Sequence, residues 1–450
     1  MAKITLAQAA LWCGGRVEEQ YKNITFCGAG NDSRTITPGQ LFVALVGVRD
    51  GNEFAPMAFQ KGAAAILTSR PDTGYPAIVV EDSRIALGQI AAALRQHIGM
   101  KVVGVTGSVG KSTTKEMIAA VLEGDYIVSK TPANFNNDLG LPMALLAMEE
   151  DTQIAVLEMG MSHFGEISYL SHIAKPDIGV ITNIGTMHME NLGSREGILQ
   201  AKLEICDGMA DDALLCLPGD DPYLWGHREH ISLPVTWFGA NNGLCQVRAS
   251  SVQQQEGISF AVQAGETEFP VTLPLEGEHF VSDALSAICV GLALQVSPER
   301  MASRLARFRN MAGRQEIFEA KGLTIINDAY NAGPESMAAA LKVLGNRNGR
   351  RIAVLGDMLE LGECTPKAHY DVGVLAARHG DILLSYGPNS CHMRQGALDG
   401  GMKEENALAF TDRQQLVLKL RQLCAPGDVL LFKGSRGMRM ELAMIQFLED

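Results

Sequence analysis

A short segment, residues 106–113, combines glycine, lysine and hydroxyl side chains in a spacing that suits phosphate binding. Gly107 and Gly110 lack Cβ atoms, so the main chain can curl its N–H groups toward an anion. Lys111 supplies a positive charge for the β- and γ-phosphates of ATP, and Ser112 offers a hydroxyl to Mg²⁺. The predicted phosphate loop therefore consists of Thr106, Gly107, Ser108, Val109, Gly110, Lys111, Ser112 and Thr113.

The loop departs in one respect from the strict phosphate-loop pattern, because Val105 occupies the position of the first glycine. A structural glycine turn is therefore the alternative interpretation. However, a strand over 101–105, the loop, a Lys-Ser pair and a helix beginning near Lys111 follow in the order that phosphate binding needs. The helix would add its positive N-terminal end. This order favours ATP binding over a structural turn.

Two strands expected beyond the loop end in side chains that can hold a metal ion. Glu158 follows an apolar run, and a carboxylate at the carboxyl end of a strand faces the crevice where open α/β sheets bind ligands. Its oxygens suit Mg²⁺. His188 comes shortly after a second strand, 178–182. Lys202 lies in a helical stretch, 198–205, and by itself is typical of a solvated lysine.

Composition restricts the classes of function that the chain can have. The 450 residues are 46% hydrophobic and 20% charged, with a formal net charge of −13, which excludes wholesale disorder and argues against binding nucleic acid through a basic surface. Nine dispersed cysteines and a start unlike a signal peptide predict a cytoplasmic protein. No apolar stretch has the length of a membrane span, and no heptad seam demands an oligomer. We therefore expect a cytoplasmic monomer without nucleic-acid partners or stable membrane association.

Alternating strand and helix patterns predict an α/β fold with three domains. Short apolar runs between polar turns indicate a small N-terminal α/β module. A central P-loop domain follows, with a mostly parallel sheet and an antiparallel edge from the alternating segment 232–275. A C-terminal Rossmann-like domain is indicated by strands at 323–327, 351–355, 382–386 and 429–433. The predicted domains are residues 1–83, 84–311 and 312–450.

A series of short strings across all three predicted domains matches one protein family in order. The strings are NDSRTITPGQLFVALVG (31–47), TGSVGKSTTKEM (106–117), TPANFNNDLGLP (131–142), EMGMSHFGEI (158–167), TNIGTMHMENLGS (182–194), AKLEI (201–205), GRQEIF (313–318), DAYNAGPESM (328–337), LGDMLELG (355–362) and KGSR (433–436). Each string alone is weak, but their common order is specific. Along essentially its whole length, the chain resembles the Mur ligases.

The resemblance implies roles for individual residues. Ser33 and Arg34 would lie near the UDP part of a substrate, in the N-terminal UDP-binding domain. The implied metal ligands are Ser112, Glu158, His188 and, as a carbamate, Lys202. An ammonium repels Mg²⁺, whereas a lysine carbamate is an anionic oxygen ligand, which gives the modification a physical reason. The implied ATP contacts from the C-terminal domain are Arg314, Asp328 and Asn331. The implied catalytic residues are Lys111, Lys202, His188 and Asn137.

The strings LGDMLELG and KGSR resemble the branch of the family that joins D-Ala-D-Ala to UDP-N-acetylmuramoyl-tripeptide (UDP-MurNAc-tripeptide). The resemblance implies an ATP-dependent ligase that works through an acyl phosphate. Its products would be UDP-MurNAc-pentapeptide, ADP and phosphate, in the last cytoplasmic step of peptidoglycan precursor assembly. A ligase that adds the third residue, or one of the folate or cyanophycin type, is an alternative, although the DNPR string of the meso-diaminopimelate type is absent. An inactive P-loop nucleotide-binding module is another.

One segment departs from the family pattern of His-Asn-x-x-Asn near the nucleotide base. Here the string is His279-Phe280-Val281-Ser282-Asp283, so two amides are replaced. An amide both donates and accepts hydrogen bonds, whereas an ionised aspartate only accepts. The resemblance therefore does not carry over the adenine contacts. It does imply that the C-terminal domain closes on the central one and brings Arg314 and Asp328 to ATP.

Overall fold

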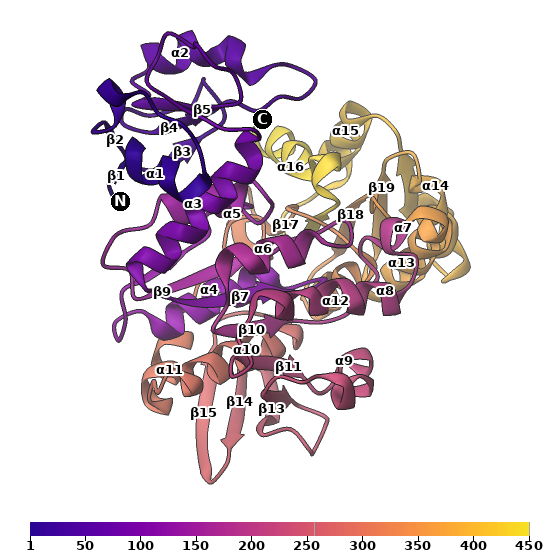
Figure 1. The fold of residues 1–450 in the computed structure, drawn as a ribbon. Helices are drawn as coiled ribbons and strands as arrows, with labels where there is room; N and C mark the ends of the chain where they lie inside the picture. Colours follow the sequence, from indigo (N-terminus) through magenta and orange to yellow (C-terminus); the bar gives the residue numbers. More distant parts are fainter. Residues whose placement is uncertain (256, 450) are drawn as a thin grey trace.

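The computed structural model describes residues 1–255 and 257–449, which form three main β-sheets with helices packed on them (Figure 1). The N-terminal sheet lies at the top left of the view, the long middle sheet crosses the centre, and the C-terminal sheet lies to the right. Most strand pairs in all three sheets are parallel. The predicted α/β class with mostly parallel sheets is therefore confirmed.

The N-terminal part has a four-stranded parallel sheet, β3-β4-β5-β6, beside a two-stranded antiparallel ribbon. Its strands are short because polar turns interrupt each apolar run, as in Thr37-Pro38-Gly39. The elements are β1 (Ile4–Thr5), α1 (Leu6–Cys13), β2 (Thr25–Phe26), β3 (Ala29–Gly30), β4 (Leu41–Val43), α2 (Ala55–Gln60), β5 (Ala65–Thr68) and β6 (Ala77–Val79).

The middle sheet has nine strands in the order β15-β14-β13-β12-β11-β10-β7-β9-β8. The strands from β8 to β13 in this order are parallel, whereas β14 and β15 form the predicted antiparallel edge. The strands are β7 (Lys101–Thr106), β8 (Val128–Lys130), β9 (Ile154–Glu158), β10 (Ile178–Ile181), β11 (Leu214–Pro218), β12 (Val235–Gly239), β13 (Val247–Gln255), β14 (Gly257–Ala264) and β15 (Thr267–Leu273). The helices are α3 (Ser83–Ile98), α4 (Lys111–Leu122), α5 (Gly140–Leu146), α6 (Glu166–Ala174), α7 (Met189–Leu192), α8 (Arg195–Leu203), α9 (Pro222–Gly226), α10 (His279–Ala293) and α11 (Pro298–Leu305).

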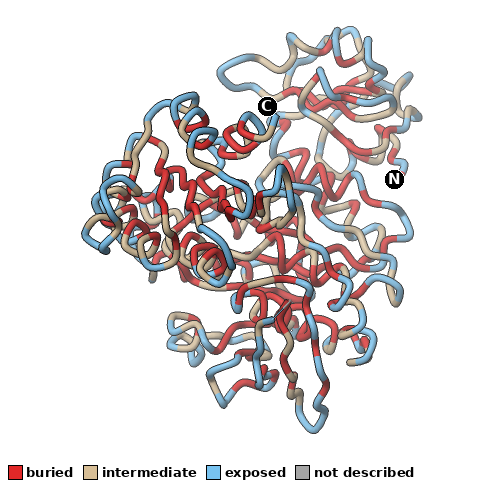
Figure 2. Tube along the Cα trace, turned by 180° about the vertical axis from the view of Figure 1, so that it is seen from behind, coloured by how far each residue is buried: buried red, intermediate tan, exposed pale blue. Residues whose placement is uncertain are grey.

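Helix α3 joins the N-terminal part to the middle sheet. The Asp82 carboxylate accepts hydrogen bonds from the N–H groups of Arg84 and Ile85 and begins the helix, and Gly99 ends it in the left-handed conformation. The helix contacts α1 on one side and α5 and α6 on the other. One core of buried side chains therefore runs from the N-terminal sheet through α3 into the middle sheet, and Figure 2 shows buried segments of the chain in red.

The C-terminal sheet has six strands in the order β16-β17-β21-β18-β19-β20, and only the edge strand β16 is antiparallel to its neighbour. Separate apolar cores cover its two faces. The strands are β16 (Glu316–Ala320), β17 (Leu323–Asp328), β18 (Arg351–Gly356), β19 (Ile382–Tyr386), β20 (Ala407–Phe410) and β21 (Val429–Lys433). The helices are α12 (Pro334–Gly345), α13 (Thr365–His379), α14 (Ser390–Asp399), α15 (Arg413–Leu423) and α16 (Met440–Leu448).

Predicted and observed elements agree closely, with one difference near the site. The helical stretch predicted over 198–205 is wrong at its end, because α8 stops at Leu203 and a 3₁₀ turn, Glu204–Gly208, follows. The Ser171 hydroxyl donates a hydrogen bond to the Ile205 carbonyl, so that carbonyl is not bound within a continuing helix. Among the described residues, no helix combines the length and apolar character that crossing a membrane requires.

Candidate active site

The carboxyl ends of β7, β9 and β10 meet at one edge of the middle sheet, where the phosphate loop follows β7. The chain places β8 and β9 on one side of β7 and β10 on the other, and such switch points are where open α/β sheets bind ligands. A cavity of about 1220 Å³ opens there, with residues of the C-terminal sheet on its far wall. The predicted site residues that line it are Ser108, Val109, Gly110, Lys111, Ser112, Thr113, Asn137, Glu158, His188, Arg314, Asp328 and Asn331.

The phosphate loop requires glycine at two positions. Gly107 has φ 146° and Gly110 has φ 87°, a region that favours glycine. A Cβ at Gly107 would lie 1.8 Å from Thr182 Oγ1, and a Cβ at Gly110 would lie 2.6 Å from Asp283 Oδ1. The loop therefore curls tightly against the end of β10 and against helix α10. No larger residue fits at either point without moving these neighbours.

The rest of the loop is tied to its surroundings by polar contacts. Thr106 is buried at the end of β7, beneath the loop. The Asn183 side chain accepts a hydrogen bond from the Val109 N–H at 3.0 Å and donates one to the Val109 carbonyl at 2.8 Å. The Thr113 hydroxyl donates to Asn310 Oδ1 at 3.4 Å. These bonds hold the loop in a preformed shape.

Lys111 lies folded over the loop. Its Nζ donates to the Gly107 carbonyl at 2.8 Å and to the Ser108 carbonyl at 3.3 Å. Burial lowers the pKa of Lys111, and the nearby charge of Glu158 opposes that effect. The ammonium can therefore exchange two neutral carbonyls for the charged oxygens of a phosphate, which make stronger hydrogen bonds.

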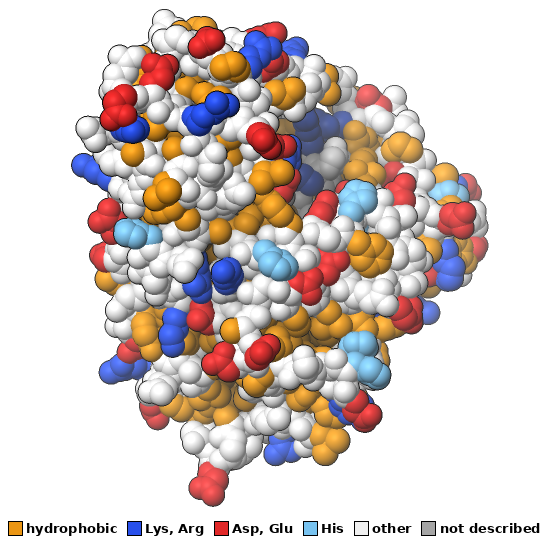
Figure 3. All heavy atoms as spheres, viewed as in Figure 1, with side chains coloured by type: hydrophobic (Ala, Val, Ile, Leu, Met, Phe, Trp, Pro, Cys, Tyr) orange, Lys and Arg blue, Asp and Glu red, His pale blue; other side chains and the backbone are white. Residues whose placement is uncertain are grey.

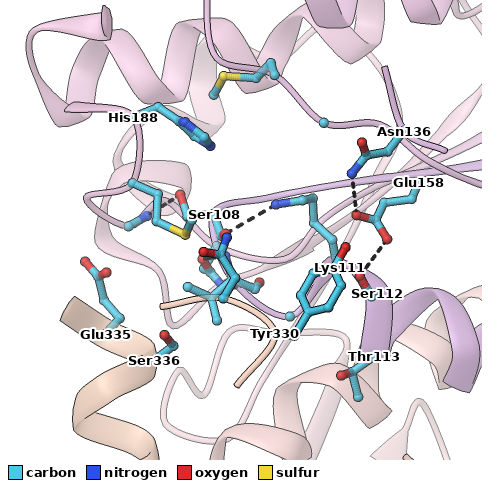
Figure 4. Close-up of a pocket in the computed structure, with 18 of the residues that line it drawn as sticks. Ser108, Lys111, Ser112, Thr113, Asn136, Glu158, His188, Tyr330, Glu335 and Ser336 are labelled. Carbon is cyan, nitrogen blue, oxygen red and sulfur yellow. Dashed lines mark hydrogen bonds between the residues drawn. The ribbon is translucent and has the colours of Figure 1, made fainter. Parts of the chain in front are cut away.

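Glu158 ends β9 and accepts hydrogen bonds on both carboxylate oxygens (Figure 4). Ser112 Oγ donates to Oε2 at 2.7 Å, and Asn136 Nδ2 donates to Oε1 at 2.8 Å. The Glu158 N–H donates to Thr131 Oγ1 at 3.0 Å, which fixes the strand end. The structure thus brings together a hydroxyl and a carboxylate, both oxygen donors of the kind that Mg²⁺ prefers.

Asn137 lines the cavity, but its side chain is engaged in local structure. Its Oδ1 accepts hydrogen bonds from the Gly140 N–H at 2.8 Å and the Leu139 N–H at 3.3 Å, so it holds the turn that leads into α5. The neighbouring Asn136 is the amide that contacts Glu158. The string TPANFNNDLGLP indicated the right segment, but spacing alone does not tell which of its asparagines turns toward the carboxylate.

His188 comes just before α7 in the left-handed conformation, with φ 63°. Its side chain is 16% exposed and lines the cavity. In Figure 4 it points into the cavity from the side opposite Glu158, with Lys111 between them. Its Nδ1 lies 2.6 Å from Oε2 of Glu360, which belongs to the C-terminal part.

Lys202 is carried by α8 and is almost fully buried, at 2% exposure, so it is not the solvated lysine that its sequence context alone indicates. Within residues 1–255 and 257–449, its ammonium has no hydrogen bond or ion pair. Burial, and then the charge of Lys111, lower the pKa of Lys202 well below its usual value. The neutral amine is the form that reacts with CO₂, so these surroundings suit the predicted carbamate.

Arg314 crosses from the C-terminal part to the phosphate loop. Its Nη2 donates to Ser112 Oγ at 2.9 Å, and its guanidinium lies 4.0 Å from the centre of the Tyr330 ring. The stacking holds the planar group in one orientation. Arg314, from the C-terminal part, and Glu158, from the middle sheet, therefore meet at the same hydroxyl.

Asp328 and Asn331 lie beside Lys433 at the carboxyl ends of β17 and β21. Lys433 Nζ donates to Asp328 Oδ2 at 2.6 Å and to the Asn331 carbonyl at 3.1 Å. The other Asp328 oxygen accepts from the Gln315 N–H at 3.1 Å. Lys433 begins the string KGSR, but no role for it was predicted, because a lysine at a strand end carries no signal without its partner.

Asp283, which replaces an amide of the family string, also lines the cavity. It is buried beneath the phosphate loop, where its Oδ1 accepts a hydrogen bond from Thr114 Oγ1 at 2.9 Å. Burial raises the pKa of Asp283 to about 7. The adjacent His279 is pushed the other way, since burial lowers its pKa to about 4. Both residues line the cavity, so the departure from the family string lies at the site itself.

The two residues predicted for the UDP part lie away from this cavity, in the N-terminal part. Ser33 is buried, with its hydroxyl 3.4 Å from the Met57 sulfur. Arg34 is exposed, and its guanidinium donates three hydrogen bonds to the Asp32 carboxylate. The Arg34 hydrogen bond lowers the pKa of Asp32 to about 2. The structure does not bring Ser33 and Arg34 together with the phosphate loop.

In the part of the chain that the structure describes, no group of three or more His, Cys, Asp or Glu side chains is placed to hold a metal ion. The predicted metal site is of a different kind, because a hydroxyl and a modified lysine complete it. Two of its members, Ser112 and Glu158, are in direct contact.

Two family models match the chain. Residues 105–291 match the Mur ligase middle domain, and residues 313–436 match the Mur ligase glutamate ligase domain. The chain is 40% identical over 446 residues to the UDP-N-acetylmuramoyl-tripeptide--D-alanyl-D-alanine ligase of Bacillus subtilis, covering 97% of this chain and 96% of that protein.

Solved structures give the same likeness. A crystal structure of MurF from Acinetobacter baumannii superposes with a TM-score of 0.92 at 32% identity, over 100% of both chains. MurF ligase from Thermotoga maritima in complex with ADP superposes with a TM-score of 0.82 at 29% identity, covering 94% of this chain and 97% of that one.

Proposed function

The chain belongs to the Mur ligase family, and we propose that it joins D-alanyl-D-alanine to UDP-MurNAc-tripeptide with ATP, giving the pentapeptide, ADP and phosphate. The UDP-N-acetylmuramoyl-tripeptide--D-alanyl-D-alanine ligases of Bacillus subtilis and Escherichia coli match 97% and 98% of this chain. The observation that carries the site-level proposal is the meeting of Glu158, Ser112 and Arg314, which joins the middle and C-terminal sheets at the phosphate loop.

ATP would bind with its β- and γ-phosphates in the phosphate loop. The start of α4 and the Lys111 ammonium both favour an anion there. The ADP complex of the Thermotoga relative supports nucleotide binding by this fold. Arg314, Asp328 and Asn331 would approach the nucleotide from the C-terminal side, because they line the opposite wall of the same cavity.

The donor set also fits Mg²⁺, with Ser112, Glu158 and His188 as the residues that would hold it. When bound, the ion would neutralise charge on the phosphoryl oxygens. We further propose that Lys202 is carbamylated. Its burial without a partner among the described residues, and its lowered pKa, support a neutral amine that is open to CO₂.

The reaction needs little covalent chemistry from side chains. The carboxylate of the tripeptide attacks the γ-phosphorus, the bond to the bridging oxygen of ADP breaks, and an acyl phosphate forms. The dipeptide amine then attacks the acyl carbon, loses a proton, and phosphate leaves. Lys111 and Arg314 would stabilise charge on the transferred group, and Asn136 would keep Glu158 oriented. Positioning and exclusion of water would supply most of the acceleration.

The UDP end of the substrate would lie toward the N-terminal part, near Ser33 and Arg34. Figure 3 shows this face hollowed between the N-terminal and C-terminal parts, with Lys and Arg side chains inside the hollow, which suits an anionic substrate. We propose three domains with one task each. Residues 1–83 would bind the UDP part of the substrate, residues 84–311 would bind ATP, and residues 312–450 would close on the ATP site.

A coupled assay of ADP release tests the proposed function. We expect release to require UDP-tripeptide and D-Ala-D-Ala together, while single amino acids in place of the dipeptide should give none. ADP release that is equally fast with a single diamino acid and the UDP-dipeptide would favour a third-residue ligase instead. Lys202→Ala should be weakly active and partly rescued by a short carboxylic acid, and undiminished activity without the acid would remove the carbamate.

A further inference from the structure

The string LGDMLELG has no role in the reaction described so far, yet it reaches across to the middle part. Residues 357–362 leave the carboxyl end of β18 and end in a 3₁₀ turn, Gly362–Cys364, which contacts α7. The segment that it meets, between β10 and α8, carries His188. The two parts of the chain therefore touch next to a predicted metal ligand.

Hydrogen bonds to other residues of the C-terminal part fix the conformation of residues 357–362. The Met358 N–H donates a hydrogen bond to His369 Nε2 at 3.0 Å. The Leu359 N–H donates to Ser435 Oγ at 2.9 Å, and the Ser435 N–H donates to the Asp357 carbonyl at 3.0 Å. Ser435 belongs to KGSR, so the two strings that marked the branch of the family build one local structure. Main-chain bonds on either side of the loop make it a fixed platform.

Glu360 is the side chain that this platform presents to His188. It has φ 63°, an uncommon conformation for a residue other than glycine, and so does His188. Its Oε2 lies 2.6 Å from His188 Nδ1, the distance of an ion pair, although the ring nitrogen is not aligned for a hydrogen bond. Next to it, a Cβ on Gly362 would lie 3.2 Å from Glu190 Cα, so the two loops are closely packed.

This contact has a chemical consequence for His188. A histidine that binds a metal ion through one ring nitrogen usually gives the proton of the other to a carboxylate, which fixes the tautomer and the direction of the ring. The negative charge of Glu360, 2.6 Å from Nδ1, favours the tautomer with its proton on that nitrogen, and this leaves Nε2 as the free lone pair. His188 also lines the cavity. Glu360, however, belongs to the C-terminal part of the chain, whereas His188 belongs to the middle part.

We propose that Glu360 is a positioning residue that orients the His188 imidazole toward the bound metal ion, and that it does so only while the C-terminal part is seated on the middle part. This inference rests on the proposed role of His188 as a metal ligand. It makes docking of the C-terminal part a requirement for a complete metal site, so metal-bound phosphate would be stabilised only in the assembled enzyme.

A purely structural ion pair is the competing explanation. Such a pair would help to hold the two parts together, and its loss would weaken every ligand to the same degree. A positioning role instead acts through His188 on the metal alone. The two explanations differ in whether nucleotide binding without metal is affected.

The test measures Mn²⁺ binding to the enzyme–ADP complex by electron paramagnetic resonance, and ADP binding without metal by calorimetry. The variants are Glu360→Gln, His188→Ala and the double substitution, all in the full chain. Glu363→Gln is the matched control, because Glu363 is an exposed carboxylate three residues further along the chain. Glu360 is itself 53% exposed, so Glu360→Gln should fold normally.

We expect Glu360→Gln to weaken Mn²⁺ binding by about tenfold or more, as loss of a carboxylate behind a metal-binding histidine does in other proteins. ADP binding without metal should stay within about twofold, and Glu363→Gln should match the parent protein. In the His188→Ala background, Glu360→Gln should have no further effect, because the residue it acts through is gone.

Three outcomes would overturn the inference and can be told apart. If His188→Ala weakens Mn²⁺ binding but Glu360→Gln does not, Glu360 has no positioning role and the proposed metal site stands. If His188→Ala leaves Mn²⁺ binding unchanged, the metal role of His188 fails and this inference falls with it. An equal loss of Mn²⁺ and metal-free ADP binding in Glu360→Gln would leave only the structural ion pair.

Discussion

The N-terminal and C-terminal parts both pack on the middle part, but through different chemistry. On the N-terminal side, a single core of buried apolar side chains crosses the boundary, including Leu6, Leu67, Leu87 and Leu157. We call this the apolar joint. On the C-terminal side, each face of the sheet has its own core. The contacts across that boundary, which we call the polar joint, include the pairs Arg314–Ser112, Glu335–Thr186, Glu276–Arg347 and Glu360–His188.

The difference indicates which joint can open. Separating an apolar joint exposes hydrocarbon to water, at about 25 cal/mol for each Å². Separating a polar joint exchanges one hydrogen bond for another to water or ligand, which changes the free energy little. We therefore infer that the N-terminal and middle parts stay together while the C-terminal part moves. The predicted closure of the C-terminal part on ATP is consistent with this contrast, since Arg314 already reaches the loop.

The largest expected effect comes from removing the charge of Lys111, which lines the cavity between the middle and C-terminal parts. Lys111→Ala should lower ADP release that depends on both peptide substrates by about a thousandfold, because charge on the transferred phosphoryl group loses its main protein partner. Lys101→Ala, an exposed lysine at the other end of β7, is the control. Turnover of Lys111→Ala close to that of the control would rule out the phosphate-loop assignment.

The apolar joint should respond in stability rather than in activity. Leu87, in α3, is fully buried in the shared core, so Leu87→Ala should lower the free energy of unfolding by about 2–5 kcal/mol. Urea unfolding measures this free energy. At urea concentrations below the unfolding transition, kcat should change by less than about twofold. Leu11→Ala, at 81% exposure on α1, should change neither quantity. A large fall in kcat for Leu87→Ala without lost stability would contradict the contrast between the joints.

The polar joint should show the reverse response. Arg314→Ala removes the bond to Ser112 and the stacking on Tyr330, so kcat should fall by about 10- to 100-fold. The free energy of unfolding should change by less than about 1 kcal/mol, since a hydrogen bond at a solvated joint contributes little. Steady-state kinetics and urea unfolding on one preparation give both values. The exposed Arg309 provides the control, Arg309→Ala. If Arg314→Ala chiefly unfolded the protein, the joint would be structural.

Much of this arrangement could be predicted from the sequence, because parallel strands fix where their ends meet. The placement of Ser112 and Glu158 followed from two strands ending at one sheet edge, and their 2.7 Å contact agrees with it. Local rules also give the turns, since Gly107 and Gly110 have the positive φ that the loop needs. These features depend on short stretches of chain and on the order of strands.

Contacts between distant segments could not be predicted in the same way. Nothing in LGDMLELG says that Glu360 will face His188, because that depends on how two sheets pack. Lys202 looked like a solvated lysine because helix periodicity does not show which neighbours cover it. Asp283 looked only like a departure from a pattern, and its contact with Gly110 and Thr114 exists only in three dimensions.

The smallest expected effect concerns Asp283, which lies beneath the phosphate loop. Its pKa, raised to about 7, means that the folded state holds a proton which the unfolded state releases near pH 4. The stabilisation from this group is therefore complete below pH ~4 and is lost as the pH rises through about 7. Asp283→Asn keeps an acceptor for Thr114 but carries no charge at any pH, and it restores the family's usual residue.

We expect the variant to gain stability relative to the parent protein as the pH rises from 5 to 8, by about 1–2 kcal/mol. The pKa shift alone would allow more, at about 1.4 kcal/mol per unit, but water in the adjoining cavity can partly solvate the ionised carboxylate. Urea unfolding at the two pH values measures the difference, with the exposed Asp212→Asn as the control. A gain that is the same at pH 5 and pH 8 would show that Asp283 does not titrate in this range. Any effect of Asp283 on the free energy of unfolding would then come from its hydrogen bonding rather than from its charge. The site would in that case differ from the apolar joint only in how its side chains pack.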